Sequence, residues 1–138
     1  TGLAAGKATL GEYRARRVCE TIQEIGQTFV QGLRKTIESV GLSFKVVGLP
    51  SFPAMRFEGF PGELSAEMNT LYLQETAKRG VLGGPGFFFC EQHSEADLDQ
   101  ALAKIGEALD VLRKAMDDGD PVKYLECPVK QLGFRRLV

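Results

Sequence analysis

The sequence predicts an α+β fold, in which a small, mostly antiparallel sheet of three or four strands packs against helices. Apolar residues recur at helical spacing in four segments, and short alternating or fully apolar runs lie between the later ones. Glycine and proline separate these segments. The predicted order is helix, helix, strand, strand, helix, strand, helix. We expect one domain over residues 1–121, followed by a tail, residues 122–138, that no pattern assigns.

The composition excludes several classes of protein. The 138 residues are 43% hydrophobic and 25% charged, which is typical of a globular domain rather than a disordered chain. The net charge of -1 gives no support for nucleic acid or a membrane as partner, and no run approaches the roughly 18 apolar residues of a membrane span. Three cysteines without a CxxC pair and one histidine indicate neither a disulfide framework nor a zinc site. They favour a cytoplasmic protein.

Two helices are predicted at the start of the chain. Residues 3–17 are rich in alanine and end in arginines, whose charge suits a helix C-terminus. Residues 18–40 carry a continuous apolar stripe with steps of three or four, and Gly41 stands where a glycine would end the helix. The stripe consists of Val18, Ile22, Ile25, Phe29, Leu33, Ile37 and Val40. Whether the two segments join into one bent helix stays open.

Two strands follow. Residues 43–48 are mostly apolar, and residues 53–58 alternate apolar and charged side chains, as a half-buried strand does. The link over residues 49–52 is short enough for an antiparallel pair. Phe60-Pro61-Gly62 then predicts a turn.

A third helix is predicted over residues 64–79, with Gly80 ending it. Its inward side chains are Leu64, Met68, Leu71, Tyr72 and Thr76. We expect a short strand to begin at residues 81–82 and glycines to break it. The fully apolar run 87–90 predicts a central strand, in which Cys90 is a small buried residue rather than a nucleophile.

The last helix has the strongest signals. Ser94 is a favourable N-cap, and Asp97, three residues later, is placed to complete a capping box. The apolar stripe steps by three or four as far as Met116, and residues 117–121 end the helix. The stripe consists of Leu98, Leu102, Ile105, Leu109, Leu112 and Met116.

The residues with chemical potential do not form a catalytic set. The spacing of the glycines at 80, 83, 84 and 86 fits no phosphate-binding loop, and a strand rather than a helix is expected after them, so we interpret them as a turn or bulge. His93 is expected to fix the corner before the last helix rather than to act as a general base. Glu95, Asp97 and Asp99 are interpreted as negative charge near the N-terminus of that helix and as solvated surface, with Glu95 and Asp97 in its first turn.

Two stretches resemble a known family. Leu3 to Leu10 resembles the "AAGLATL" helix that follows the active-site segment of class-III aminotransferases. The step Gly80-Val81-Leu82, the aromatic run and then His93 to Asp99 resemble that family up to its "HTEEDID" signature. The most similar branch is that of glutamate-1-semialdehyde aminomutase, and the resemblance covers residues 2–116.

The resemblance implies that the chain is the C-terminal small domain of a fold-type-I enzyme dependent on pyridoxal phosphate. The family's cofactor is bound by a lysine and a threonine that precede the matched region. It therefore implies no catalytic and no cofactor-binding residue in this chain. It implies two partners, the large cofactor-binding domain and a second copy in a homodimer.

The resemblance also places a loop on the substrate side of the active site, formed by Gly83, Gly84, Pro85 and Gly86. The aminomutase branch has an acidic residue near the position of Pro85, where no acid stands here. A general aminotransferase is therefore at least as consistent with the residues as an aminomutase.

The nature of the chain itself, a piece of an enzyme or an independent protein, stays open. The start at Thr1, without methionine or a basic segment, indicates an internal piece of a longer chain. The alternative is a stand-alone binding domain that keeps the fold without the chemistry. A hydrolase or a metalloenzyme is disfavoured, because no nucleophile–base pair or ligand set is present.

Overall fold

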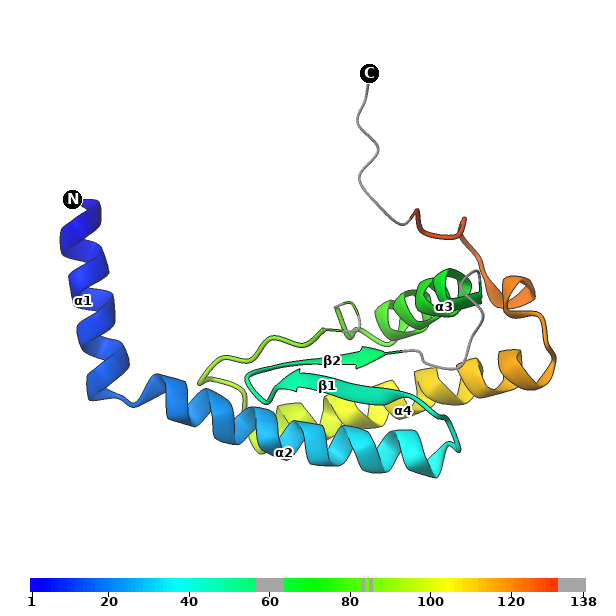
Figure 1. Ribbon diagram of the computed structural model, residues 1–138, viewed down its shortest axis with the longest axis horizontal. Helices are drawn as coiled ribbons and strands as arrows, with labels where there is room; N and C mark the ends of the chain where they lie inside the picture. Colours follow the sequence, from blue (N-terminus) through cyan, green and yellow to red (C-terminus); the bar gives the residue numbers. More distant parts are fainter. Residues whose placement is uncertain (57–63, 83, 85, 132–138) are drawn as a thin grey trace, which may run out of the picture.

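The computed structural model describes residues 1–56, 64–82, 84 and 86–131. Figure 1 shows α2 and α4 running side by side, with the β1–β2 hairpin against α2, α3 beyond it, and α1 projecting from the rest. The elements are α1 (Gly2–Ala15), α2 (Val18–Ser39), β1 (Lys45–Leu49), β2 (Phe52–Arg56), α3 (Leu64–Lys78), α4 (Glu95–Asp117) and a 3-10 helix, η1 (Pro121–Tyr124). The α+β class is confirmed. No helix in these ranges is both long and apolar enough to cross a membrane.

The first two helices are separate. Arg17 has a φ of 52°, a left-handed conformation that interrupts the helical hydrogen bonding between α1 and α2. No residue of α1 is buried. In α2 the predicted stripe is buried at four of its seven positions, Val18, Phe29, Leu33 and Ile37. Gly41, with a φ of 72°, ends the helix region as predicted.

The hairpin is antiparallel, as predicted, with Lys45 opposite Arg56 and Leu49 opposite Phe52. Both strands are five residues long and lie within one or two residues of their expected positions. Its tip packs against α2 at Gly26, where a Cβ would collide with the carbonyl oxygen of Pro50. Glycine at this position therefore lets the hairpin approach the helix.

The prediction of a third, central strand over residues 87–90 is wrong. The described residues form a two-stranded sheet, joined to the 86–90 segment by one isolated bridge between Ala54 and Gly86. Phe87 adds one hydrogen bond, from its N–H to the carbonyl oxygen of Pro53 at 2.9 Å. The expected strand at residues 81–82 is also not formed. An apolar run predicts burial, but burial here comes from ring packing on α2 rather than from strand pairing.

Cys90 is exposed, and its expected burial is therefore wrong. It ends the aromatic segment at the point where the chain turns into α4. The backbone N–H and carbonyl of Cys90 are hydrogen-bonded to His93 at this corner, and the Cys90 side chain faces solvent.

The two C-terminal long helices follow their patterns. In α4, the Ser94 Oγ accepts from the Asp97 N–H, and the Asp97 carboxylate accepts from the Ser94 N–H at 2.8 Å, which confirms the capping box. The stripe is buried at Leu98, Ile105, Leu109 and Leu112, whereas Leu102 and Met116 are half-buried. In α3 the expected inward residues Met68, Leu71, Tyr72 and Thr76 are buried. The expected turn at residues 60–62 and the side chain of Leu64 lie outside the described part.

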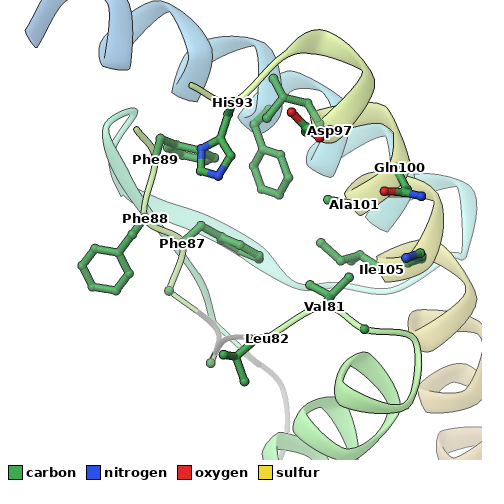
Figure 2. Close-up of a pocket in the computed structure, with 16 residues that line it drawn as sticks. Val81, Leu82, Phe87, Phe88, Phe89, His93, Asp97, Gln100, Ala101 and Ile105 are labelled. Atoms are coloured by element: carbon green, nitrogen blue, oxygen red, sulfur yellow. The ribbon is translucent and has the colours of Figure 1, made fainter. Parts of the chain in front are cut away.

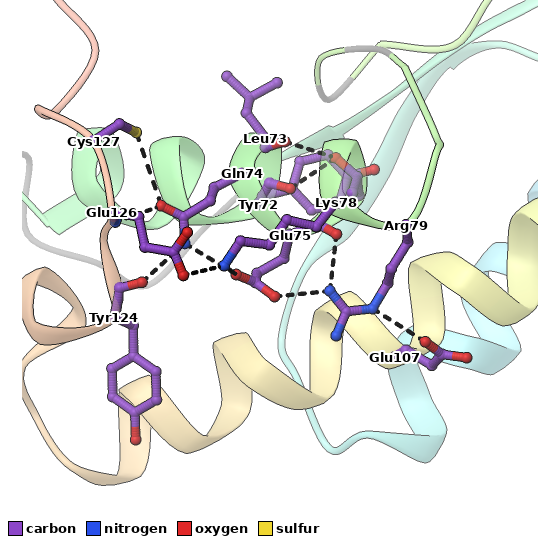
Figure 3. Close-up of polar contacts among 11 residues, drawn as sticks. Tyr72, Leu73, Gln74, Glu75, Lys78, Arg79, Glu107, Tyr124, Glu126 and Cys127 are labelled. Atoms are coloured by element: carbon purple, nitrogen blue, oxygen red, sulfur yellow. Dashed lines mark hydrogen bonds and ion pairs between the residues drawn. The ribbon is translucent and has the colours of Figure 1, made fainter.

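Part of the unassigned tail docks on α3 (Figure 3). The side chain of Gln74 donates to the carbonyl oxygen of Tyr124 at 2.9 Å and accepts from the N–H of Glu126 at 2.6 Å. Farther along the tail, the Lys130 N–H donates to the hydroxyl of Thr70 at 3.0 Å. Residues 124–130 therefore run along α3, bound through these backbone hydrogen bonds and through an ion pair between Lys78 and Glu126.

The same face of α3 holds a buried carboxylate. Glu75 is 6% exposed and pairs with Lys78 at 3.1 Å and with Arg79 at 2.7 Å. Burial by itself would raise the pKa of Glu75, but hydrogen bonds from Gln74, Arg79 and Lys78 together outweigh it and lower the pKa. Glu75 is therefore ionised near neutral pH.

Candidate functional site

A pocket of about 430 Å³ lies between residues 80–82, 84 and 86–89 and the N-terminal half of α4, with α2 at its back (Figure 2). This volume falls within the roughly 300–1,000 Å³ of small-molecule sites. One wall is apolar and the other is the polar face of α4. The residues that define these walls are Phe29, Phe87, Phe89, His93, Asp97, Gln100, Ala101 and Lys104.

The apolar wall is formed by phenylalanine rings in contact with one another. Phe29 of α2 lies 4.9 Å from Phe87 and 5.2 Å from Phe89, measured between ring centroids, and the rings are tilted. Because side chains alternate along an extended segment, Phe88 points the other way and is 77% exposed. On that side its ring packs on the ring of Phe52 in the hairpin, with 4.5 Å between the ring centroids.

The polar wall is one face of α4. Asp97, Gln100 and Lys104 are separated by three and four residues, which places them in a row along the helix. Lys104 is half-buried, and its Nζ lies beside Gly80, where a Cβ would be 3.8 Å from it. Within the described ranges, Lys104 forms no ion pair.

His93 stands at the corner that the sequence predicts for it. The backbone N–H of Cys90 donates to His93 Nδ1 at 3.1 Å, and the His93 N–H donates to the Cys90 carbonyl at 3.2 Å. The neutral imidazole that accepts at Nδ1 carries its proton on Nε2. The ring meets Phe89 edge-on at 6.2 Å and reaches into the pocket, as Figure 2 shows. His93 therefore offers an N–H donor there.

The side chain of Asp97 caps the N-terminus of α4. Its carboxylate accepts from the hydroxyl and the N–H of Ser94, and these bonds hold the pKa of Asp97 below its usual value. Glu95 and Asp99 are exposed and lie in the first turns of α4, in agreement with their expected role as N-terminal charge. The described residues contain no group of three potential metal ligands.

The predicted substrate-side loop reaches the pocket in part. Gly84 and Gly86 line it, and Gly86 makes the isolated bridge to Ala54. Gly83 and Pro85 lie outside the described residues. Sequence reasoning missed Lys104 and Phe29, because neither belongs to a motif. The available signal was that Lys104 lies seven residues, two helical turns, after Asp97.

No family model and no curated protein sequence matches this chain. Solved structures do match its fold. A structure of the pyridoxal-phosphate internal aldimine form of the FumI protein from Sphingopyxis sp. MTA144 matches with a TM-score of 0.68 and 22% identity, over 84% of this chain and 27% of that one. An omega-transaminase from Sphaerobacter thermophilus matches with a TM-score of 0.63 and 13% identity, over 68% and 24%.

A transaminase with pyridoxal phosphate bound matches with a TM-score of 0.62 and 19% identity, over 69% of this chain and 23% of that one. The chain therefore spans about a quarter of the length of these structures. Its fold is that of the C-terminal part of transaminases. At these identities, the likeness shows the fold and not the activity.

Proposed function

We propose that this chain is the small C-terminal domain of a transaminase-like enzyme of class III, which covers the substrate side of an active site built mainly by a large domain. The observation that carries the proposal is the fold match over 84% of this chain but only 27% of the FumI chain. The corner before α4 supports it, because the residues from His93 to Asp99 resemble the family signature.

Pyridoxal phosphate, the cofactor of the proposed parent enzyme, stores electrons during the movement of an amino group. The described residues of this chain do not fit it. The N-terminus of α4 is closed by the side chains of Ser94 and Asp97, and the carboxylate there repels a phosphate. Lys104 is the one cation among the described residues that line the pocket. The cofactor site of the parent therefore belongs to the large domain.

The parent's reaction is proposed as amino-group transfer rather than the aminomutase reaction. The sequence carries no acid in the loop 83–86, where the aminomutase branch has one. The role of this chain is then to exclude water and to shape the substrate side through Gly84, Gly86 and the aromatic segment.

The projecting helix α1 supports a partner on this chain. It has no buried residue, and Leu3 is 94% and Leu10 66% exposed. An isolated helix of this length is marginal in water, so a covering surface would stabilise it. We assign that surface to the large domain of the parent and to a second copy in a homodimer.

Two experiments test the proposal. The chain alone, mixed with pyridoxal phosphate and reduced with borohydride, is expected to show no adduct on a single lysine and no transaminase activity. A stoichiometric adduct at one lysine would contradict this. The reading frame upstream of Thr1 is expected to encode about 250–300 further residues with the cofactor lysine, given roughly 100–200 residues per domain. An initiation codon directly before Thr1, after an in-frame stop, would favour a stand-alone binding domain.

A further inference from the structure

We propose that the aromatic pocket itself binds a small organic monoanion, a carboxylate that carries an aromatic or bulky apolar group. The pocket is built by this chain alone, from α2, α4 and residues 80–82, 84 and 86–89. The inference therefore goes beyond the proposed function and does not depend on it.

The apolar wall selects the body of the ligand. Three phenylalanine rings, Phe29, Phe87 and Phe89, lie in mutual contact through Phe29 and face the same space. Tilted and edge-on ring contacts favour a further ring among them. Leu98, Ala101 and Ile105 complete this wall without adding charge.

Lys104 selects the charge of the ligand. Glu107 is the carboxylate closest in sequence to Lys104 on α4. It forms an ion pair with Arg79 at 3.1 Å, and Arg79 also pairs with Glu75. Among the described residues, Lys104 thus has no carboxylate partner, and it lies at the edge of an apolar wall, where a carboxylate on a ligand would form an ion pair with it.

The other end of the pocket does not neutralise Lys104. Asp97 lies seven residues earlier on α4, about 10 Å along the helix axis at 1.5 Å per residue. Its carboxylate is held by Ser94. His93 Nε2–H is a donor directed into the pocket, which suits an acceptor atom on the ligand. One cation and one donor, with a carboxylate at the far end, favour a monoanion over a phosphate.

The test uses 3-phenylpropionate as the probe and 3-phenylpropan-1-ol as its neutral match. Each is titrated into the 15N-labelled full chain and followed by NMR. The carboxylate is expected to bind saturably and about fivefold tighter than the alcohol, the effect of a partly exposed ion pair. The amide signals of Gly84, Phe87 and Lys104 are expected to shift.

Three variants locate the site. Lys104→Gln is expected to remove the fivefold preference for the carboxylate, whereas Lys114→Gln, at an exposed position on the same helix, keeps it. Ala101→Phe fills the pocket and is expected to abolish binding of both probes, with signal dispersion reporting whether the fold is intact.

Three outcomes would overturn the proposal. They are a titration without saturation, equal affinity for acid and alcohol, and equal effects of the two lysine variants. None of them bears on the cofactor and reading-frame tests, so failure here is distinguishable from failure of the proposed function.

Discussion

Ile105 lies on α4 at the border of the core and the aromatic pocket. It is fully buried and belongs to the central apolar cluster. We expect Ile105→Ala to lower the free energy of unfolding by about 2–5 kcal/mol, because the truncation removes apolar contacts and leaves a cavity. Urea denaturation measures this loss, and Lys114→Ala, at an exposed position of the same helix, is the control. A loss of less than about 0.5 kcal/mol would place Ile105 among surface positions.

Glu75 makes stability depend on pH. Its pKa is lowered in the folded chain, so its contribution is present above the unfolded pKa of about 4.3 and is lost as the pH falls through the lowered folded value. We expect Glu75→Gln to lower the free energy of unfolding at pH 7 by about 1–3 kcal/mol, since bonds to a charged group are lost.

The difference between Glu75→Gln and the unmodified chain should shrink in strong acid, where both carry a neutral side chain. Denaturation curves across the acid range measure it. Glu24→Gln, an exposed position on α2, is the control and should show no such convergence. A difference that stays constant with pH would show that Glu75 acts through shape rather than charge.

At the scale of elements, one side chain of α3 contacts two peptide groups of the tail. Gln74 binds both the Tyr124 carbonyl and the Glu126 N–H. We expect Gln74→Ala to speed hydrogen exchange at the Glu126 amide and to cost about 1–2 kcal/mol of stability, the value of two such bonds. Gln31→Ala, exposed on α2, should leave this amide unchanged. Unchanged exchange in Gln74→Ala would mean that other contacts hold the tail.

The tail makes contacts that its sequence pattern does not predict. Residues 124–130 make backbone hydrogen bonds to α3. Their sequence has no helical or alternating period, so periodicity gives no signal for a segment that is bound through its backbone.

At the scale of the whole molecule, α1 is the element that lacks a partner surface. Leu3 and Leu10 are seven residues apart and share one face of this exposed helix. We expect the chain to self-associate through this face, because apolar patches left exposed tend to find partners and a symmetric pair closes them. Sedimentation velocity across a concentration series measures the state.

The double substitution of Leu3→Glu and Leu10→Glu is expected to weaken this association at least ~10-fold. Ala8→Glu, on the opposite side of α1, is the matched control and should have a smaller effect. If the chain stays monomeric at all concentrations, the expectation that the Leu3 and Leu10 face of α1 mediates self-association is wrong.

The four long helices, the start of α4 and the hairpin could be predicted from the sequence, whereas the break between α1 and α2 at Arg17 could not. The Ser94–Asp97 capping box, the glycine after α2 and the apolar stripes of α2 and α4 act within one or two turns of the chain, where neighbouring residues decide the energy. The corner at His93 was predictable for the same reason, since its hydrogen bonds join residues three apart.

The partners of residues 87–90, the surroundings of Lys104 and the position of the tail depend on tertiary contacts and could not be predicted. A run of apolar residues has the same pattern whether a neighbouring strand or a set of rings buries it, and here Phe29 supplies the burial from α2. Glu107, three residues after Lys104, pairs instead with Arg79, which follows α3, so that no described carboxylate pairs with Lys104. Each outcome depends on competition between groups far apart in the chain, which no local pattern records.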